Sequence, residues 1–163
     1  KNIAPAGLTI GIVKTALLDR VPDNVPEMMD WQLQISKNSM YNTPPVFDIY
    51  VANLVFEHLI AQGGVTAIYK HNQEQAARLY DYLDASTCFT APVTKKNRSF
   101  TNIVFTTGDE TKDQKIAVEA THAGLYYLGG HRSVGGLRAS LYNAQTDDAI
   151  TALIKFLQRY EGK

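Results

Sequence analysis

The first third of the chain passes from a strand-like pattern to a stretch with no period. Apolar, β-branched residues alternate with smaller or polar ones over residues 7–14, which predicts a strand that leaves a turn at Pro5. A short helix is expected to follow at residues 15–20. Residues 21–42 carry scattered prolines and asparagines without a sustained period, so we expect a long loop with brief ordered pieces.

Two helices are predicted for the middle of the chain. Thr43 is a suitable N-cap for the first, because the prolines that follow it are tolerated in a first helical turn. Apolar residues then recur at helical spacing as far as the glycine pair 63–64, which is expected to end this helix. The second helix is expected from about residue 65 to residue 83, with one apolar and one polar face.

The last part of the chain mixes strand and helix patterns. The predicted elements are, in order, a strand within 97–107, a helix over 112–123, a short strand at 125–128, a strand at 137–142 and a helix over 146–160. Thr146 is the expected N-cap of the last helix. This order predicts an α+β sandwich. The change of pattern at the glycine pair predicts a domain boundary, with residues 1–62 and 63–163 as the two domains.

Composition excludes several classes of protein. The chain has 163 residues, 45% of them hydrophobic and 20% charged, which is typical of a globular domain. Its 16 basic and 16 acidic side chains cancel, so no overall field favours nucleic acid or a membrane surface, and any anion site must be local. No apolar run approaches the roughly 18 residues of a membrane span, so we expect a cytoplasmic protein. The single cysteine and the scattered histidines predict neither a disulfide framework nor a metal site.

The chemistry with the clearest signal lies in the segment "GGHRSVGGLRAS", residues 129–140. Its glycines suit a backbone with positive φ, and the planar guanidinium groups of Arg132 and Arg138 match a carboxylate or a phosphate, at about 1.5–3 kcal/mol for each charge-assisted bond. The alternative is a pair of tight turns with solvated arginines. Asn42 and Thr43 leave a similar choice between a helix cap and an anion site at a helix N-terminus.

Four motifs carry a resemblance to a known family. They are "KNIAPAG" at 1–7, "SMYNTPP" at 39–45, "NRSFTNIVF" at 97–105 and "GGHRSVGGLRASLYNA" at 129–144. Together and in this order, the motifs resemble the phosphoserine aminotransferase family, a group of class V, fold-type I enzymes that use pyridoxal 5′-phosphate (PLP). The similarity runs across essentially the whole chain.

The resemblance implies an α/β fold. Residues 1–62 would form the end of the large PLP-binding domain, and residues 63–163 the small α+β C-terminal domain. Family members are about twice as long, and their N-terminal portion supplies the aspartate at the pyridine nitrogen and the aromatic residue stacked on the ring. We therefore expect a C-terminal part of the enzyme, as a fragment, a cleaved product or a sequence divided at a modified lysine. Such a part alone is expected to be inactive.

The resemblance also implies the roles of the cofactor residues. Lys1 matches the lysine that carries PLP as an internal aldimine, and that passes a proton between the substrate Cα and the cofactor. Asn42 and Thr43 match an Asn-Thr pair that reaches the cofactor phosphate of the neighbouring subunit, in a homodimer with shared active sites. One departure is Ala4, which stands where the family has glycine and would be strained if the position needs positive φ.

The substrate residues follow from the last motif. His131 and Arg132 match a pair that binds the substrate's phosphate or side-chain carboxylate across the subunit interface, and Arg138 matches the arginine that holds the α-carboxylate. The implied reaction, part of serine biosynthesis, moves an amino group between O-phosphoserine and 2-oxoglutarate, with 3-phosphohydroxypyruvate and glutamate as products. No nucleic acid, membrane or metal takes part.

Two alternatives stay open. Another fold-type I PLP enzyme, such as an alanine–glyoxylate-type aminotransferase or a cysteine desulfurase, would have a similar fold, although a pocket for a dianionic side chain would be wasted on its substrates. The second alternative is an interaction domain that has kept the fold without the cofactor half. The first alternative is tested by whether the full-length protein prefers phosphoserine or alanine as amino donor. The second is tested by whether the full-length protein shows the visible absorption of bound PLP.

Overall fold

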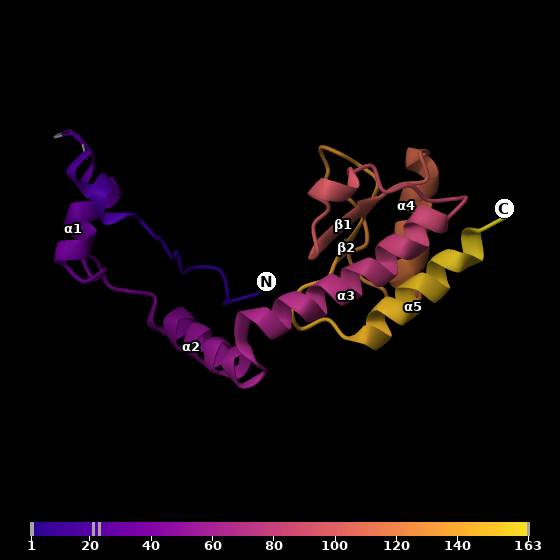
Figure 1. Ribbon diagram of the computed structural model, residues 1–163. Helices are drawn as coiled ribbons and strands as arrows, with labels where there is room; N and C mark the ends of the chain where they lie inside the picture. Colours follow the sequence, from indigo (N-terminus) through magenta and orange to yellow (C-terminus); the bar gives the residue numbers. More distant parts are fainter. Residues whose placement is uncertain (1, 21, 23, 163) are drawn as a thin grey trace. The chain divides into compact units, whose positions relative to one another are not determined.

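A computed structural model of the chain describes residues 2–20, 22 and 24–162, so Lys1 lies outside the described residues. Contacts within the chain divide it into two units (Figure 1). One unit holds residues 3–58, and the other holds Asn2 together with the chain from Leu59 onward. Each unit is described below by itself.

The first unit consists of short helices joined by irregular chain. Two 3-10 helices, η1 (Thr15–Arg20) and η2 (Glu27–Met29), precede the α-helix α1 (Trp31–Ser36). Asp30 caps α1, because its side chain accepts hydrogen bonds from the backbone N–H groups of Gln32 at 2.9 Å and Leu33 at 3.2 Å. The short helix expected at residues 15–20 and the brief ordered pieces of the following loop are therefore confirmed.

The strand predicted for residues 7–14 is not formed. Within the described part of the chain, the strands are β1 (Asn102–Phe105) and β2 (Leu137–Ser140), which together form a two-stranded sheet. A strand is stable only when a neighbouring strand takes up its backbone N–H and C=O groups, and none of the described residues forms a strand or bridge pairing with residues 7–14. Ile12 accordingly remains 96% exposed. Ala4 is not among the residues with positive φ, so the expected strain there is absent.

The helix α2 (Val46–Ala61) begins later than the sequence predicts. Its first turn starts from the carbonyl of Pro45, which accepts a hydrogen bond from the Ile49 N–H at 3.0 Å, so the prediction of Thr43 as the N-cap is wrong. The reason is steric. A residue that precedes proline is disfavoured in the α region, and both Thr43 and Pro44 precede a proline.

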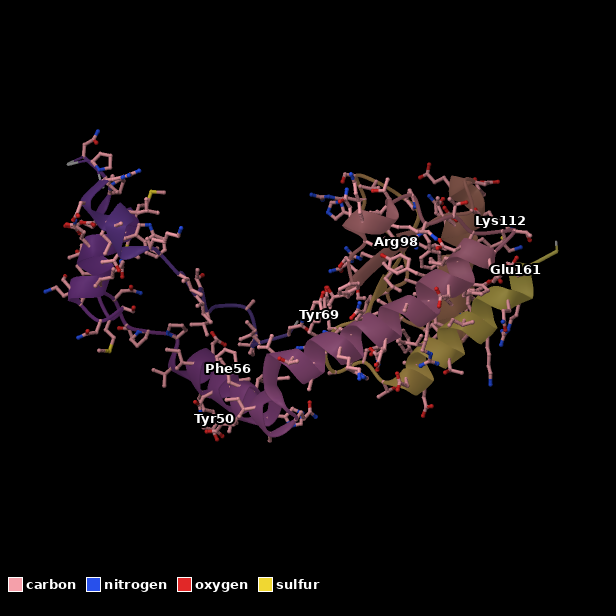
Figure 2. The ribbon with its side chains drawn as sticks, in the orientation of Figure 1. Tyr50, Phe56, Tyr69, Arg98, Lys112 and Glu161 are labelled. Atoms are coloured by element: carbon pink, nitrogen blue, oxygen red, sulfur yellow. The ribbon has the colours of Figure 1, made fainter. Side chains whose placement is uncertain are left out.

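Apolar side chains surround α2 on all sides, and most of them are exposed. The only buried residue on this helix is Ala52. The exposed large side chains are those of Val46, Phe47, Ile49, Tyr50, Leu54, Phe56 and Ile60, two of which are labelled in Figure 2. A helix that is apolar all round is typically buried in the core of a larger protein. Among the described residues, no single helix is long and apolar enough to cross a membrane, although α2 and the next helix, α3 (Gly64–Ala85), pass together as a bent pair by length and composition alone.

The second unit contains the core. After α3 (Gly64–Ala85) come a 3-10 turn η3 (Lys95–Asn97), β1, α4 (Glu110–His122), β2, α5 (Asp147–Leu157) and a 3-10 turn η4 (Gln158–Tyr160). The helices α3 and α5 pack side by side (Figure 1). Thr146 caps α5 by accepting the Ala149 N–H at 3.3 Å, as predicted. The strand expected at residues 125–128 is absent, because Tyr127 takes the left-handed conformation with φ of 61°.

The two strands set the direction of the site residues. They are antiparallel, with Ile103 opposite Ala139 and Phe105 opposite Leu137, and these four side chains are buried in the core. Because side chains alternate along a strand, Arg138 points to the opposite face from Leu137 and Ala139. The sheet thereby turns Arg138 away from the apolar core.

The motif at residues 97–105 has a structural explanation. Arg98, which is labelled in Figure 2, directly follows η3 in this motif. It donates two hydrogen bonds to the carboxylate of Asp84, at 2.9 and 2.5 Å, and its guanidinium lies 4.4 Å from the centre of the Tyr80 ring. These bonds hold the pKa of the Asp84 carboxyl well below its usual range. Ser99 then accepts the backbone N–H groups that lead into β1. Arg98 therefore joins the end of α3 to the start of the sheet.

Glu161 connects the C-terminal turn of this unit to the end of α3. Its carboxylate accepts hydrogen bonds from Ser86 Oγ at 2.6 Å, Tyr82 Oη at 2.8 Å, Thr87 Oγ1 at 2.9 Å and the Thr87 N–H at 3.0 Å. The hydrogen bond from Ser86, with those from Tyr82 and Thr87, lowers the pKa of Glu161 to about 2. The charged form is thus favoured in the folded state, and Glu161 ties the last turn to the end of α3 (Figure 2).

We expect Glu161→Gln in the full-length protein to lower the free energy of unfolding at neutral pH by about 1–2 kcal/mol, the lower part of the range for charge-assisted bonds because solvent screens this group. Since folding depresses the pKa of Glu161, its contribution is present above about pH 4.5 and is lost as the pH falls toward about 2. Urea unfolding at several pH values measures this slope. Glu74→Gln, on the exposed face of α3, is the control; a slope identical in Glu161→Gln and wild type would contradict the prediction.

Candidate functional site

The glycine-rich segment forms a hairpin. Gly129 pairs with Leu137, the Gly130 N–H donates to the Gly136 carbonyl at 2.9 Å, and the Arg138 N–H donates to the Leu128 carbonyl at 2.8 Å. A Cβ atom on Gly130 would lie 1.9 Å from the carbonyl oxygen of Gly135, so only glycine permits this approach. The hairpin places residues 131–135 in the loop and Arg138 in the strand that leaves it.

His131 and Arg132 lie exposed in this loop. The Ser133 N–H donates to His131 Nδ1 at 3.3 Å, and the Ser133 hydroxyl lies 2.7 Å from the same nitrogen. These contacts occupy Nδ1 and leave Nε2 of the exposed ring without a contact to Ser133. The loop therefore presents an imidazole nitrogen beside a guanidinium group, which is a combination suited to an anion.

Arg132 lines a hollow of about 360 Å³. The other charged side chains of this hollow make it poorly suited to bind an anion. Glu110 and Asp113 line the same hollow, and carboxylates repel a negatively charged ligand. Asp113 is buried and already accepts hydrogen bonds from Thr106 Oγ1, the Thr107 N–H and Thr107 Oγ1. The charge around Arg132 thus favours a ligand that approaches the loop from outside.

Arg138 lines a different and larger cavity, of about 510 Å³. Tyr126, Tyr127, Ser140 and Gln145 contribute to its wall, and none of the described residues that line it is acidic. Arg138 Nε is buried and has no hydrogen-bond partner in the part of the chain that the structure describes. A buried guanidinium nitrogen without a partner is costly, and a carboxylate in the cavity would satisfy it.

Asn42 and Thr43 belong to the first unit, and both are exposed. The Asn42 amide donates only a long hydrogen bond, 3.4 Å, to the Thr43 carbonyl. Because α2 begins at Val46, neither side chain caps it. The cap interpretation is thus excluded for Thr43, whereas the role of the pair in binding a phosphate stays a prediction.

The structure brings the predicted residues together only in part. Arg138 shares a hairpin with His131 and Arg132, yet Arg138 and Arg132 line different hollows. Lys1 lies outside the described residues, but the backbone N–H of Asn143 donates to the side-chain oxygen of its neighbour, Asn2, at 2.9 Å. Sequence patterns gave no signal for this contact. Across residues 2–20, 22 and 24–162, no group of three or more His, Cys, Asp or Glu side chains is arranged to hold a metal ion.

Comparison with known proteins places the chain in a family. Residues 1–153 match the family model described as aminotransferase class-V. Over 163 residues, the chain is 54% identical to a phosphoserine aminotransferase of Leuconostoc mesenteroides, a match that covers 99% of this chain and 45% of that protein. A phosphoserine aminotransferase of Listeria monocytogenes is 49% identical over 160 residues, which cover 98% of this chain and 44% of the relative.

Solved structures agree with these relatives. A phosphoserine aminotransferase structure that reports radiation damage of its Schiff base superposes with a TM-score of 0.92 at 39% identity, over 98% of this chain and 44% of that one. The enzyme from Bacillus circulans subsp. alkalophilus gives a TM-score of 0.85 at 34% identity, over 90% and 41%. The chain spans less than half the length of the relatives that it matches. The predicted fold class is confirmed, and the chain belongs to the class-V aminotransferase family, in which it matches the C-terminal part of the phosphoserine aminotransferases.

Proposed function

We propose that the chain is the C-terminal part of a PLP-dependent phosphoserine aminotransferase. The enzyme moves the amino group between O-phosphoserine and 2-oxoglutarate, with 3-phosphohydroxypyruvate and glutamate as products. The observation that carries this proposal is Arg138, whose buried Nε has no partner among the described residues, at a cavity without a carboxylate. Every one of these substrates has an α-carboxylate that such a guanidinium would bind.

The described residues fit PLP as the cofactor. Solved relatives include a PLP-bound phosphoserine aminotransferase from Trichomonas vaginalis, 36% identical to this chain with a TM-score of 0.79 over 85% of it. Asn42 and Thr43, free of any capping role, offer an amide and a hydroxyl donor to a phosphate. Lys1 would hold the cofactor through Nζ. When bound, PLP supplies the electron sink for the carbanion at the substrate Cα.

The chain's own residues would bind the substrate and transfer the proton at its Cα. Arg138 binds the α-carboxylate and so fixes the substrate Cα. Lys1 takes the proton from that carbon and returns it on the product side, which requires a neutral amine. His131 and Arg132 bind the phosphate of phosphoserine, or the side-chain carboxylate of glutamate, in the site of the other subunit of a homodimer. The acidic wall of the hollow at Arg132 supports this outward role.

The fragment by itself is expected to be inactive. The apolar circumference of α2 is exposed in this chain, which supports a partner surface from the remainder of the enzyme or from the second subunit. The same surface argues against a free-standing interaction domain, because such a domain would expose this helix in its resting state.

The experiment that tests the proposal measures transamination by the full-length protein with PLP and 2-oxoglutarate. We expect phosphoserine to exceed alanine as amino donor by about 100-fold in kcat/KM, because alanine lacks the dianionic group that His131 and Arg132 would bind. A preference for alanine would favour an alanine–glyoxylate-type enzyme. A folded, colourless protein that cannot be reconstituted with PLP would favour the interaction domain.

A further inference from the structure

Three asparagines connect the residue after Lys1 to the helix α3. The Asn143 N–H donates to Asn2 Oδ1 at 2.9 Å, and Asn143 Oδ1 accepts a hydrogen bond from Asn72 Nδ2, also at 2.9 Å. Asn72 lies on α3 and is only 8% exposed. The chain of bonds therefore runs within the second unit, from Asn2 through the turn after β2 to a buried position on α3.

The turn that contains Asn143 is held at more than one point. One helical turn after Asn72, Gln75 Nε2 donates to the Gln145 carbonyl at 2.9 Å and to Asp147 Oδ1 at 3.2 Å. Gln75 is almost completely buried, at 1% exposure. Among the described residues, nothing donates to the buried oxygens Asn72 Oδ1 and Gln75 Oε1. A desolvated acceptor without a hydrogen bond lowers the stability of the fold, so both buried amides are retained at a cost. Buried amides that fix one turn rigidly indicate that its position matters.

The position of the turn at Asn143 matters because the turn follows the strand with Arg138 and binds Asn2. Arg138 precedes Asn143 by five residues, on the strand that leads into the turn. Asn2 is bonded covalently to Lys1. Proton transfer at the substrate Cα requires the lysine and the arginine that holds the substrate to keep a fixed separation, and a misplacement of about 1 Å can cost roughly 100-fold in rate.

We infer that Asn143 is a positioning residue: with Asn72, it fixes Asn2, the residue that follows Lys1, to the turn after the strand that carries Arg138. This inference rests on the proposed function. It assigns none of the three asparagines a contact with substrate or cofactor. Their effect is on the geometry in which Lys1 meets the substrate Cα, and so on the rate of proton transfer more than on substrate affinity.

The test uses full-length protein reconstituted with PLP. Asn143→Ala removes the side-chain acceptor for Asn72 but keeps the backbone N–H that donates to Asn2, whereas Asn143→Asp keeps both the acceptor oxygen and the backbone N–H. Asn2→Ala removes the other end of the chain of bonds, and Gln73→Ala, on the exposed side of α3, is the control. For each protein, kcat, KM, the melting temperature and the isotope effect with α-deuterated phosphoserine are measured. Mass spectrometry after borohydride reduction gives the fraction of Lys1 that carries PLP.

We expect Asn143→Ala and Asn2→Ala to lower kcat by roughly tenfold, with KM changed by less than about threefold and a larger isotope effect, because proton transfer becomes slower. The fraction of Lys1 that carries PLP falls in the same two variants. Asn143→Asp and the control stay near wild type. The double variant Asn2→Ala/Asn143→Ala loses no more than the larger single loss, as expected for groups in one network.

An unchanged kcat in both alanine variants overturns the inference. So does a lower kcat that comes with a lower melting temperature and an unaltered isotope effect, since that combination indicates only a structural role. A wild-type protein that carries no PLP on Lys1 and does not transaminate overturns the proposed function, and this inference with it. An active wild type with unaffected variants overturns the inference alone.

Discussion

Full-length protein with Lys1→Ala is expected to transaminate at least about 1,000-fold more slowly than wild type. The substitution removes both the amine that attaches PLP and the base that moves the proton at the substrate Cα, and positioned acid–base groups alone contribute roughly 100- to 10,000-fold. The measurement is the turnover of phosphoserine with 2-oxoglutarate. In parallel, the visible absorption of the protein is recorded before and after borohydride reduction, which fixes attached PLP to the chain.

Lys14→Ala provides a matched control for this prediction, because Lys14 is an exposed lysine of the same segment. It is expected to retain wild-type turnover and one borohydride-fixed PLP per chain on Lys1. If Lys1→Ala kept its activity, or if borohydride fixed PLP to another lysine, Lys1 would not be the attachment residue. The proposed roles of Arg138 and of the three asparagines would then fail as well, because both roles are defined relative to Lys1.

The spacing of apolar residues predicted the helices that bury one face against the core. The helices α3 and α5 each bury one face against the core, so helical spacing was sufficient to find them. Residues 7–14 have the pattern of a strand, but in the part of the chain that the structure describes no strand pairs with them. A pattern gives the tendency to form a strand, whereas the strand itself depends on a partner.

The structure differs from the sequence prediction at two further places, and in each the cause is the conformation of residues at that place. The start of α2 at Val46 follows from the effect of a proline on the residue before it, which acts on both Thr43 and Pro44. The strand expected at 125–128 fails because Tyr127 turns the chain in the left-handed region before the hairpin begins. No residue type there indicates this conformation, because tyrosine rarely adopts it.

The candidate site was predictable by residue type but not by arrangement. Arginines between glycines indicated anion binding, and resemblance to a family assigned Arg132 and Arg138 to different groups of the substrate. The structure adds the surroundings of each arginine, because Arg132 lines a hollow with two carboxylates and Arg138 lines a cavity without carboxylates. Asn72 and Asn143 are 71 residues apart, and no pattern in the sequence relates them.

The separation of the two arginines predicts different kinetic losses. Arg138→Ala in the full-length protein should lower kcat/KM by about 100-fold for phosphoserine and for glutamate alike, since both present an α-carboxylate and a charge-assisted pair contributes roughly 1.5–3 kcal/mol. Arg138→Lys should recover only part of this loss, because an ammonium group cannot reproduce the two parallel bonds of a guanidinium.

Arg132→Ala should instead lower kcat/KM by about 100-fold for phosphoserine and by only about tenfold for glutamate, because a phosphate dianion gains more from a guanidinium than a carboxylate does. The ratio of the two kcat/KM values is therefore the informative quantity: it should change about tenfold in Arg132→Ala and stay constant in Arg138→Ala. Arg78→Ala, an exposed arginine on α3, should leave both values at the wild-type level. Equal losses for both substrates in Arg132→Ala would show that the loop binds a group common to them, and the division of the hairpin into two anion sites would be wrong.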